Sequence, residues 1–137
     1  MLKTEFKEID LSTRDRLDFV DITDIASSFV KKCKVESGIF VINTTHSTAA
    51  IIVNENEAGL KEDILRKVRE VFFKGDDWHH NRVDSNAVAH LGSIFLGHSK
   101  IFPIKEGRLV RGTWQNIFFL EMDGPRRRKV TLEVMGI

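Results

Sequence analysis

A chain of 137 residues, 42% of them hydrophobic, has the size of one ordinary domain and can bury a core without disulfides. Its 21 lysine and arginine residues nearly balance 20 aspartate and glutamate residues, so no overall field draws it to nucleic acid or to an anionic membrane. The single cysteine, Cys33, excludes an internal disulfide. The start of the chain shows no secretion signal and no apolar run is long enough to cross a bilayer, so we expect one soluble, cytoplasmic domain over residues 1–137.

The first elements expected are a strand and a helix. Residues 2–9 alternate polar and apolar side chains, as a strand with one wet face does. After a polar link, apolar residues recur at helical spacing over 21–33, and Asp21 is placed to cap this helix. Cys33 falls on the apolar side of the helix, where a buried and inert thiol is expected, so it is given no role.

Two strands and a second helix come next. The β-branched runs at 38–45 and 49–55 stand on either side of THST and predict a pair of adjacent, buried strands. Helical spacing returns over 57–73, with acids and bases alternating on the opposite face. This second helix is expected to lie on the surface.

The second half predicts a short helix followed by strands. Residues 86–97 have helical spacing, with Asp84 or Ser85 placed to cap the helix, although Gly92 weakens the pattern. The rest reads as strands separated by the turn KEGR, ending in an alternating strand over 128–137. Strands outnumber helices and the turns are tight, which favours an α+β fold: a single domain of antiparallel β-sheets, sandwich-like, with two to three flanking helices.

The histidines are the first candidates for chemistry. His46 lies among hydroxyl-bearing residues where two apolar strands meet, so it either lines a cleft or forms a hydrogen-bonded turn. The stretch WHHNRVDSNAVAH adds His79, His80 and His90, of which His79 and His80 cannot face the same centre if the segment is extended. His46, His80 and His90 could form an open three-histidine metal site, with Asp84 orienting one imidazole. The alternative is an ordinary polar loop, because the spacing matches no stereotyped metal motif.

A third polar segment is GTWQNIFFLEMDGPRRRK. Strand alternation would send Arg126 and Arg128 to one face and Arg127 to the other, and paired guanidinium groups suit a phosphate. The alternative is a solvated basic turn that balances nearby acids. Nucleic-acid binding is not expected, because no other basic cluster with interleaved aromatic residues extends the patch.

Taken together, HSTAAIIVNENE, DSNAVAHLGSIFLGHS and GRLVRGTWQNIFFLEMDGPRRR resemble, in order and spacing, the YjbQ-like family, also labelled secondary thiamine-phosphate synthases. The resemblance runs from about residue 21 to the end. It implies an α+β fold, a homotrimer, and a pocket in which histidines surround a metal or an anion. The family histidines would be His46, His80 and His90, and the other motif positions are Glu55, Asp84, Asn86, Gln115, Glu121, Arg126 and Arg128, whereas His79 and Arg127 are not motif positions.

The resemblance also implies weak thiamine-phosphate synthesis, which joins a hydroxymethylpyrimidine diphosphate to a thiazole phosphate and releases diphosphate. The expected catalytic residues are His46, Glu55, Asp84 and Glu121. The expected substrate and phosphate contacts are Ser47, Thr48, Asn86, Gln115, Arg126 and Arg128. Three histidines suit zinc or a similar divalent metal better than magnesium, although magnesium remains an option for a diphosphate.

Two other functions stay open at the level of sequence. One is a metal-dependent hydrolase or phosphoryl-transfer enzyme of unknown substrate, with Glu55 or Glu121 as base. The other is a non-catalytic oligomeric protein that binds a phosphorylated metabolite. All three readings share one partner, a small phosphorylated metabolite, and none involves nucleic acid or a membrane.

Overall fold

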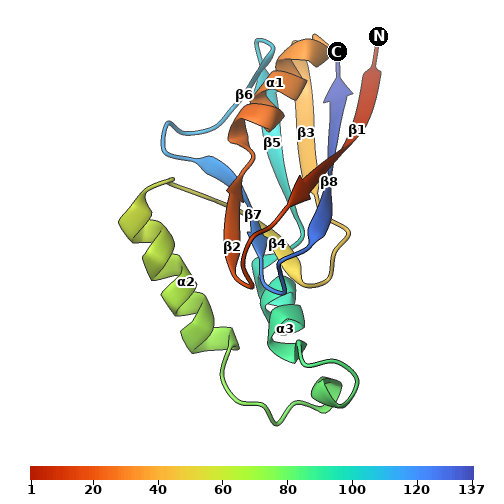
Figure 1. Cartoon of the computed structure of the whole chain (residues 1–137). Coiled ribbons are helices and arrows are strands. Elements are labelled where there is room, and N and C mark those ends of the chain that lie inside the picture. The colour runs from red at the N-terminus through yellow and green to blue at the C-terminus, as the bar shows by residue number, and fades with distance from the viewer.

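The fold of residues 1–137, seen in a computed structural model, consists of two antiparallel sheets and three α-helices (Figure 1). The expected α+β domain of antiparallel sheets is confirmed. The strands are β1 (Lys3–Ser12), β2 (Asp18–Asp21), β3 (Ser37–Asn43), β4 (Ala49–Asn54), β5 (Ser99–Lys105), β6 (Arg108–Leu109), β7 (Asn116–Glu121) and β8 (Arg127–Gly136). The helices are α1 (Thr23–Cys33), α2 (Ala58–Phe72) and α3 (Ala87–Leu96), with a 3₁₀ turn, η1, over His79–Arg82.

The strands form a five-stranded sheet in the order β1-β8-β3-β5-β6 and a three-stranded sheet in the order β2-β7-β4. The prediction that the strands at 38–45 and 49–55 are neighbours is wrong, because β3 pairs with β5 and β8 whereas β4 pairs with β7. Instead, the polar segment between them carries the chain from one sheet to the other. This crossing places the THST residues at an edge where both sheets end.

The three-stranded sheet is covered on both faces. Ile117 and Phe119 of β7 belong to the main core shared with the five-stranded sheet and α1, whereas Leu120 packs with residues of α2 and α3. A strand buried on both faces needs apolar residues at every position, which explains the unbroken run IFFL. The five-stranded sheet buries Phe40 on its inner face and leaves Ile101 of the adjacent strand 65% exposed, so the expectation that β3 is fully buried holds for one face only.

The start of α1 differs from the prediction by two residues. The short strand β2, which the sequence pattern did not reveal, occupies Asp18–Asp21, and the helix begins at Thr23. Asp21 still acts at the helix start, because its Oδ1 accepts a 2.9 Å hydrogen bond from the Thr23 N–H. Burial, followed by the neighbouring Glu5, raises the pKa of the Cys33 thiol to about 11, in line with an inert side chain.

The remaining helices lie on the outer side of the three-stranded sheet (Figure 1). Helix α3 is confirmed, but the predicted caps are wrong: the Ala87 N–H donates to Oδ1 of Asn81 at 3.1 Å, and neither Asp84 nor Ser85 caps the helix. Gly92, which weakens the helical pattern, has a packing role. A Cβ at this position would lie 2.6 Å from the Met122 sulfur, so only glycine lets the helix lie this close to the sheet end.

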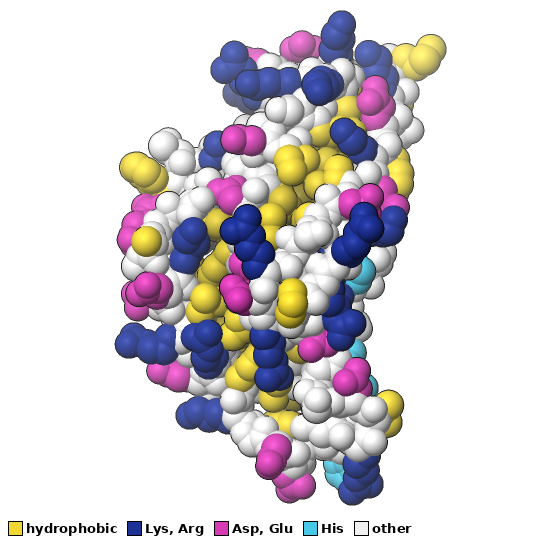
Figure 2. Space-filling model, viewed as in Figure 1, with side chains coloured by type: hydrophobic (Ala, Val, Ile, Leu, Met, Phe, Trp, Pro, Cys, Tyr) yellow, Lys and Arg dark blue, Asp and Glu magenta, His cyan; other side chains and the backbone are white.

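Charged side chains of both signs are interspersed over the face seen in Figure 2, as the near-zero net charge leads one to expect. None of the helices combines the length and the apolar composition that a membrane-spanning helix needs.

Candidate functional site

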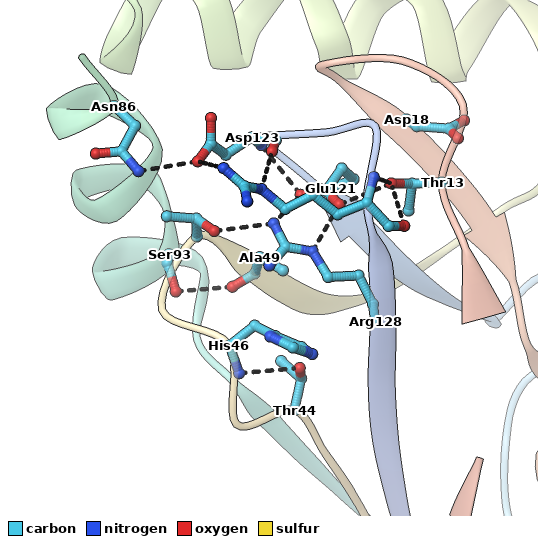
Figure 3. Close-up of polar contacts among 12 residues, drawn as sticks. Thr13, Asp18, Thr44, His46, Ala49, Asn86, Ser93, Glu121, Asp123 and Arg128 are labelled. Atoms are coloured by element: carbon cyan, nitrogen blue, oxygen red, sulfur yellow. Dashed lines mark hydrogen bonds and ion pairs between the residues drawn. The ribbon is translucent and has the colours of Figure 1, made fainter. Parts of the chain in front are cut away.

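A buried ion pair joins the two sheets at one end of the three-stranded sheet (Figure 3). Glu121, the last residue of β7, is fully buried, and Arg128 of β8 is 6% exposed. The Arg128 Nε donates to Oε1 of Glu121 at 2.7 Å and its Nη2 donates to Oε2 at 2.6 Å. The Glu121 carboxylate also accepts hydrogen bonds from the Thr13 hydroxyl at 2.8 Å and from the backbone N–H of Asp123 at 3.0 Å. This pair therefore fixes β7, β8 and the β1–β2 connection to one another.

The ion pair changes the predicted roles of its members. A carboxylate that has no exposed surface and accepts four hydrogen bonds is not available as a base, so the catalytic role expected for Glu121 does not fit its geometry. The positive charge of Arg128 is paired with the Glu121 carboxylate. The Arg128 Nη2 also donates to the Thr48 hydroxyl at 3.0 Å. Arg126 is likewise held by a carboxylate, Asp123, at 3.2 Å. The two arginines are thus paired separately, and they do not form the expected pair of free guanidinium groups on one face.

His46 is held at the edge of the ion pair by the backbone of β8. Its Nε2 accepts a 2.8 Å hydrogen bond from the N–H of Lys129, and its own N–H donates to the Thr44 hydroxyl at 3.3 Å. Because a backbone N–H can only donate, Nε2 carries no proton and the neutral ring is protonated on Nδ1. Burial, followed by the positive charge of Arg128, lowers the pKa of His46, which favours this neutral form. His46 therefore offers one N–H donor.

The largest cavity, of about 580 Å³, lies between the β3–β4 connection and α3. Its lining residues are Asn43, Thr44, Thr45, His46, Ser47, His90, Ser93, Ile94 and His98. All the lining residues except Ile94 carry a hydroxyl, amide or imidazole group, and no carboxylate takes part. We call this space the central cavity.

A second cavity, of about 300 Å³, adjoins the central cavity at His46, which lines both. Its other lining residues are Asp10, Arg127, Arg128 and Lys129, so three cationic side chains face one acid. Lys129 is partly neutralised by Glu8 at 3.0 Å and by Asp10 at 3.5 Å. We call this space the basic cavity. Arg127, which the motif comparison set aside, lines it.

A third cavity, of about 340 Å³, adjoins the central cavity on the other side, where His90 lines both. It is lined by Trp78, His79, His80, Ala87, His90 and Leu91, and we call it the aromatic cavity. The His80 and His90 rings meet edge to face with centroids 4.6 Å apart, as their predicted approach requires. The Nε2 of His80 lies 2.9 Å from Oδ1 of Asn86. Asn86, expected to contact substrate, instead links His80 to Asp123.

The three predicted metal ligands do not form one centre within the chain. His80 and His90 are in contact, but His46 belongs to the other end of the central cavity, and its Nε2 is hydrogen-bonded to Lys129. No group of three histidine, cysteine, aspartate or glutamate side chains is placed to hold a metal ion. A three-histidine centre therefore does not fit this donor set, in which only two imidazoles come together.

Three other predicted site residues, Glu55, Gln115 and Asp84, have side chains that line none of the three cavities. Glu55 and Gln115 come at the far end of the three-stranded sheet, since Ala49 pairs with Glu121 and Asn54 pairs with Asn116. Five residues of strand separate the two ends by about 17 Å. The Gln115 side chain accepts a 2.8 Å hydrogen bond from the Gly112 N–H and so stabilises a turn. Asp84 is exposed, and its backbone alone makes hydrogen bonds.

The expected contacts at Ser47 and Thr48 are placed near the histidines, with different outcomes. Ser47 lines the central cavity, as a substrate contact should. Thr48 is buried, and its hydroxyl accepts from Arg128. It therefore supports the ion pair.

Sequence reasoning missed His98, Ser93 and Asp123. His98 enters the central cavity because β3 and β5 pair with Asn43 opposite Ser99, and its Nδ1 lies 2.7 Å from Oδ1 of Asn43. Ser93 follows His90 by about one helical turn, and this spacing could have placed both side chains on one face of the helix. The contact of Asp123 with Asn86 could not be read from the sequence, because the two residues lie 37 positions apart.

The comparisons with known proteins agree with this fold. The sequence model described as "UPF0047 protein YjbQ-like" matches residues 7–137. The chain belongs to this family. A UPF0047 protein of Archaeoglobus fulgidus is 44% identical over 130 residues, covering 93% of this chain and 99% of the relative, and the UPF0047 protein YugU of Bacillus subtilis is 36% identical, covering 99% and 100%.

Solved structures of proteins with similar sequences also have this fold. The crystal structure of a YbjQ-like protein of unknown function from Sulfolobus solfataricus superposes with a TM-score of 0.98 at 49% identity and covers all of both chains. A hypothetical protein from Aeropyrum pernix has a TM-score of 0.93 at 42% identity, with 97% of this chain and 99% of that one covered. The fold described above is thus one that UPF0047 relatives adopt along their whole length.

Proposed function

We propose that this UPF0047 chain binds a small phosphorylated metabolite across the basic and central cavities, with a phosphate group at His46. The observation that carries the proposal is the placement of His46, which lines both cavities and carries its proton on Nδ1. A neutral imidazole N–H can donate to a phosphate oxygen without needing protonation at neutral pH.

The surroundings of His46 support an anionic ligand. The backbone N–H groups of Thr45 and Ser47, which both line the central cavity, make no hydrogen bond within the chain, so they are free to donate. Free N–H groups in a turn are a common way to bind phosphate oxygens. The central cavity has no acidic lining residue, and Arg127 adds a cation to the basic cavity without a carboxylate of its own. These donors favour an anion over a cation.

For the reaction, we propose thiamine-phosphate-synthase-like chemistry, which rests on the family resemblance. The donors at His46 would stabilise the leaving diphosphate, and the aromatic cavity, with Trp78 and Leu91, offers apolar surface for a ring of the substrate. A divalent ion would meet only His80 and His90 within one chain, so a metal-dependent hydrolase is the less favoured reading.

The oligomeric state is also a proposal. The outer face of the five-stranded sheet exposes Ile39, Ile101 and Met135, which lie on neighbouring strands. An uncovered apolar sheet face is the kind of surface that buries well against another subunit. It supports the homotrimer that the resemblance implies, acting in the cytoplasm.

Binding is tested by titrating the protein with inorganic phosphate and diphosphate while following thermal unfolding and heat. Saturation at one hundred times the dissociation constant should stabilise the protein by about 2.7 kcal/mol. His46→Ala should weaken binding about tenfold, the effect of losing one hydrogen bond to a charged group. His79→Ala is the matched control, because His79 lies outside the basic and central cavities. Equal affinity of the wild type and His46→Ala would overturn the phosphate assignment.

Turnover is tested separately with hydroxymethylpyrimidine diphosphate and thiazole phosphate as substrates. The wild type should form thiamine phosphate, and His46→Ala should form it more slowly. Diphosphate binding without any turnover would support a non-catalytic phosphometabolite-binding protein instead.

A further inference from the structure

A line of hydrogen bonds runs from a carboxylate at the end of β7 to one of the histidines. Oδ2 of Asp123 accepts from Nδ2 of Asn86 at 2.8 Å and from the Arg126 guanidinium at 3.2 Å. On its other side, Asn86 presents Oδ1 to Nε2 of His80 at 2.9 Å. Figure 3 shows the Asn86 amide reaching toward Asp123 from the start of α3. These contacts involve four residues from three separate segments.

The order of donors along this line fixes the position of one proton. An ionised carboxylate can only accept, so the amide nitrogen of Asn86 must face Asp123. The amide oxygen then faces His80, and an oxygen without a proton can only accept. Nε2 of His80 must therefore be the donor, and it carries a hydrogen whether the ring is neutral or cationic.

The amide has little freedom to turn over. Asn86 is 6% exposed, and a flipped amide would direct its oxygen at the Asp123 carboxylate, placing two acceptors against each other without a donor between them. Arg126 holds the carboxylate from the opposite side through two bonds, one to the side chain and one from Nε to the backbone oxygen at 2.9 Å. Asn86 is thus a fixed acceptor for His80.

We propose that Asn86, held by Asp123, keeps a proton on Nε2 of His80, so that Nδ1 is the ring nitrogen that accepts a hydrogen bond from a ligand in the aromatic cavity. The proposal rests on the proposed function, because the ligand cavity lies next to His80: His90 contacts the His80 ring and lines the central cavity. Asn86 and Asp123 are positioning residues.

The chemical consequence is a hydrogen-bond acceptor of fixed orientation. Nδ1 of the neutral ring carries no proton in this tautomer, so it can accept a hydrogen bond from an N–H or O–H group of the ligand while Nε2–H stays bound to Asn86. The Asp123 carboxylate polarises the Asn86 amide and so strengthens the bond that holds the ring. This is the orienting role that the sequence assigned to Asp84, and the structure gives it to Asn86 and Asp123.

Nitrogen-15 NMR of the histidine side chains tests the tautomer directly. The wild type should show a His80 Nε2–H proton that exchanges with water slowly enough to be observed, with Nδ1 unprotonated at high pH. Asn86→Ala should lose the slowly exchanging proton. Asp123→Asn should retain it, because the new amide oxygen can still accept from Asn86, whereas Asp123→Ala should shorten its lifetime. Asp123→Ala also serves as the second variant if Asn86→Ala fails to fold.

Kinetics separate this proposal from the phosphate site. Asn86→Ala should lower kcat/KM for thiamine-phosphate formation at least tenfold with diphosphate affinity unchanged, because His80 orients the ring of the substrate whereas His46 holds the phosphate. A slowly exchanging Nε2–H that survives both Asn86→Ala and Asp123→Ala would overturn the inference. Failure of the phosphate assignment would show instead as unchanged diphosphate affinity in His46→Ala, a result that leaves the His80 measurement standing.

Discussion

The two ends of the three-stranded sheet each carry a carboxylate that accepts several hydrogen bonds, but only one end forms a site. At the site end, Glu121 is buried and pairs with the charged Arg128. At the far end, Asp21 is exposed, and its two oxygens accept from Thr23, Asn56 and Asn116, all neutral donors. A dense set of hydrogen bonds is therefore common to both ends and does not distinguish them.

The difference lies in the donors that remain unused. Near Glu121 and Arg128, the His46 Nδ1–H and the backbone N–H groups of Thr45 and Ser47 have no partner in the chain, and these three residues line the central cavity. Around Asp21 the hydrogen bonds cap α1 and connect strand ends, so the donors of Thr23, Asn56 and Asn116 are already paired within the chain. A buried ion pair holds the site end together, and the unused donors beside it support the proposed binding of an anion.

The largest expected effect comes from breaking the ion pair. Arg128→Met would leave Glu121 buried without a counter-charge, which costs about 3–5 kcal/mol of unfolding free energy. Urea denaturation followed by circular dichroism measures this loss. Because the pair also anchors the strand that fixes His46, phosphate affinity should fall as well.

Two controls identify the cause. Arg127→Met changes the neighbouring exposed arginine and should alter stability by less than about 0.5 kcal/mol. The double variant Glu121→Leu with Arg128→Met removes both charges and should be less destabilised than Arg128→Met alone. If the double variant were the less stable protein, an unpaired buried charge would not be the reason for the loss.

At the far end, Asp21→Ala should cost about 1–2 kcal/mol, the usual value for losing a helix-terminal carboxylate that accepts backbone and side-chain bonds. Thermal or urea unfolding measures the change. Diphosphate affinity should stay at the wild-type value, since the far end lies about 17 Å from the site. Loss of diphosphate binding in Asp21→Ala would show that the two ends are coupled.

The smallest effect is a difference in acid sensitivity between the two ends. The pKa of His46 is lowered from 6.5 in the folded protein. As the pH falls, the imidazole of the unfolded chain is therefore protonated before that of the folded protein. The contribution of His46 to the free energy of unfolding is complete above pH 6.5 and declines below it. For Asp21, burial acts to raise the pKa, but the hydrogen bonds from Thr23, Asn56 and Asn116 outweigh it, and the pKa is lowered from 3.8. Its contribution is complete above pH 3.8 and declines below that value.

Urea titrations between pH 8 and pH 5 isolate the first window. The wild type should lose more stability across this range than His46→Asn, which has no proton to take up at that position. Asp21→Asn should follow the wild type in the same range. Parallel curves for the wild type and His46→Asn would mean that the neutral form of His46 is not favoured by the fold.

The sequence predicted the elements well because their patterns are local. The helices over 23–33, 58–72 and 87–96 and most strands follow from apolar spacing within each segment. The pairing of strands is not local. The runs 38–45 and 49–55 were expected to be neighbours, and only the polar crossing between them, which changes sheet, separates the two.

The candidate site was predicted in part for the same reason. His46, His80 and His90 do line adjoining cavities, since the motifs that carry them meet at one edge. What Glu121 and Arg128 do could not be read from spacing, because burial and pairing depend on the contact between two sheets. A glutamate that acts as a base and a glutamate in a buried ion pair cannot be distinguished from the sequence alone.

Gly92 sets a dimension of the site without touching it. The helix α3 can lie against Met122 only because position 92 has no side chain, and His90 and Ser93, which flank it, line the central cavity from another side of the helix. A methyl group at position 92 would push α3 away from Met122 at the end of the sheet and would shift the wall of the central cavity outward. The size of ligand that fits can therefore change through a residue that never contacts the ligand, which makes position 92 a starting point for altering specificity.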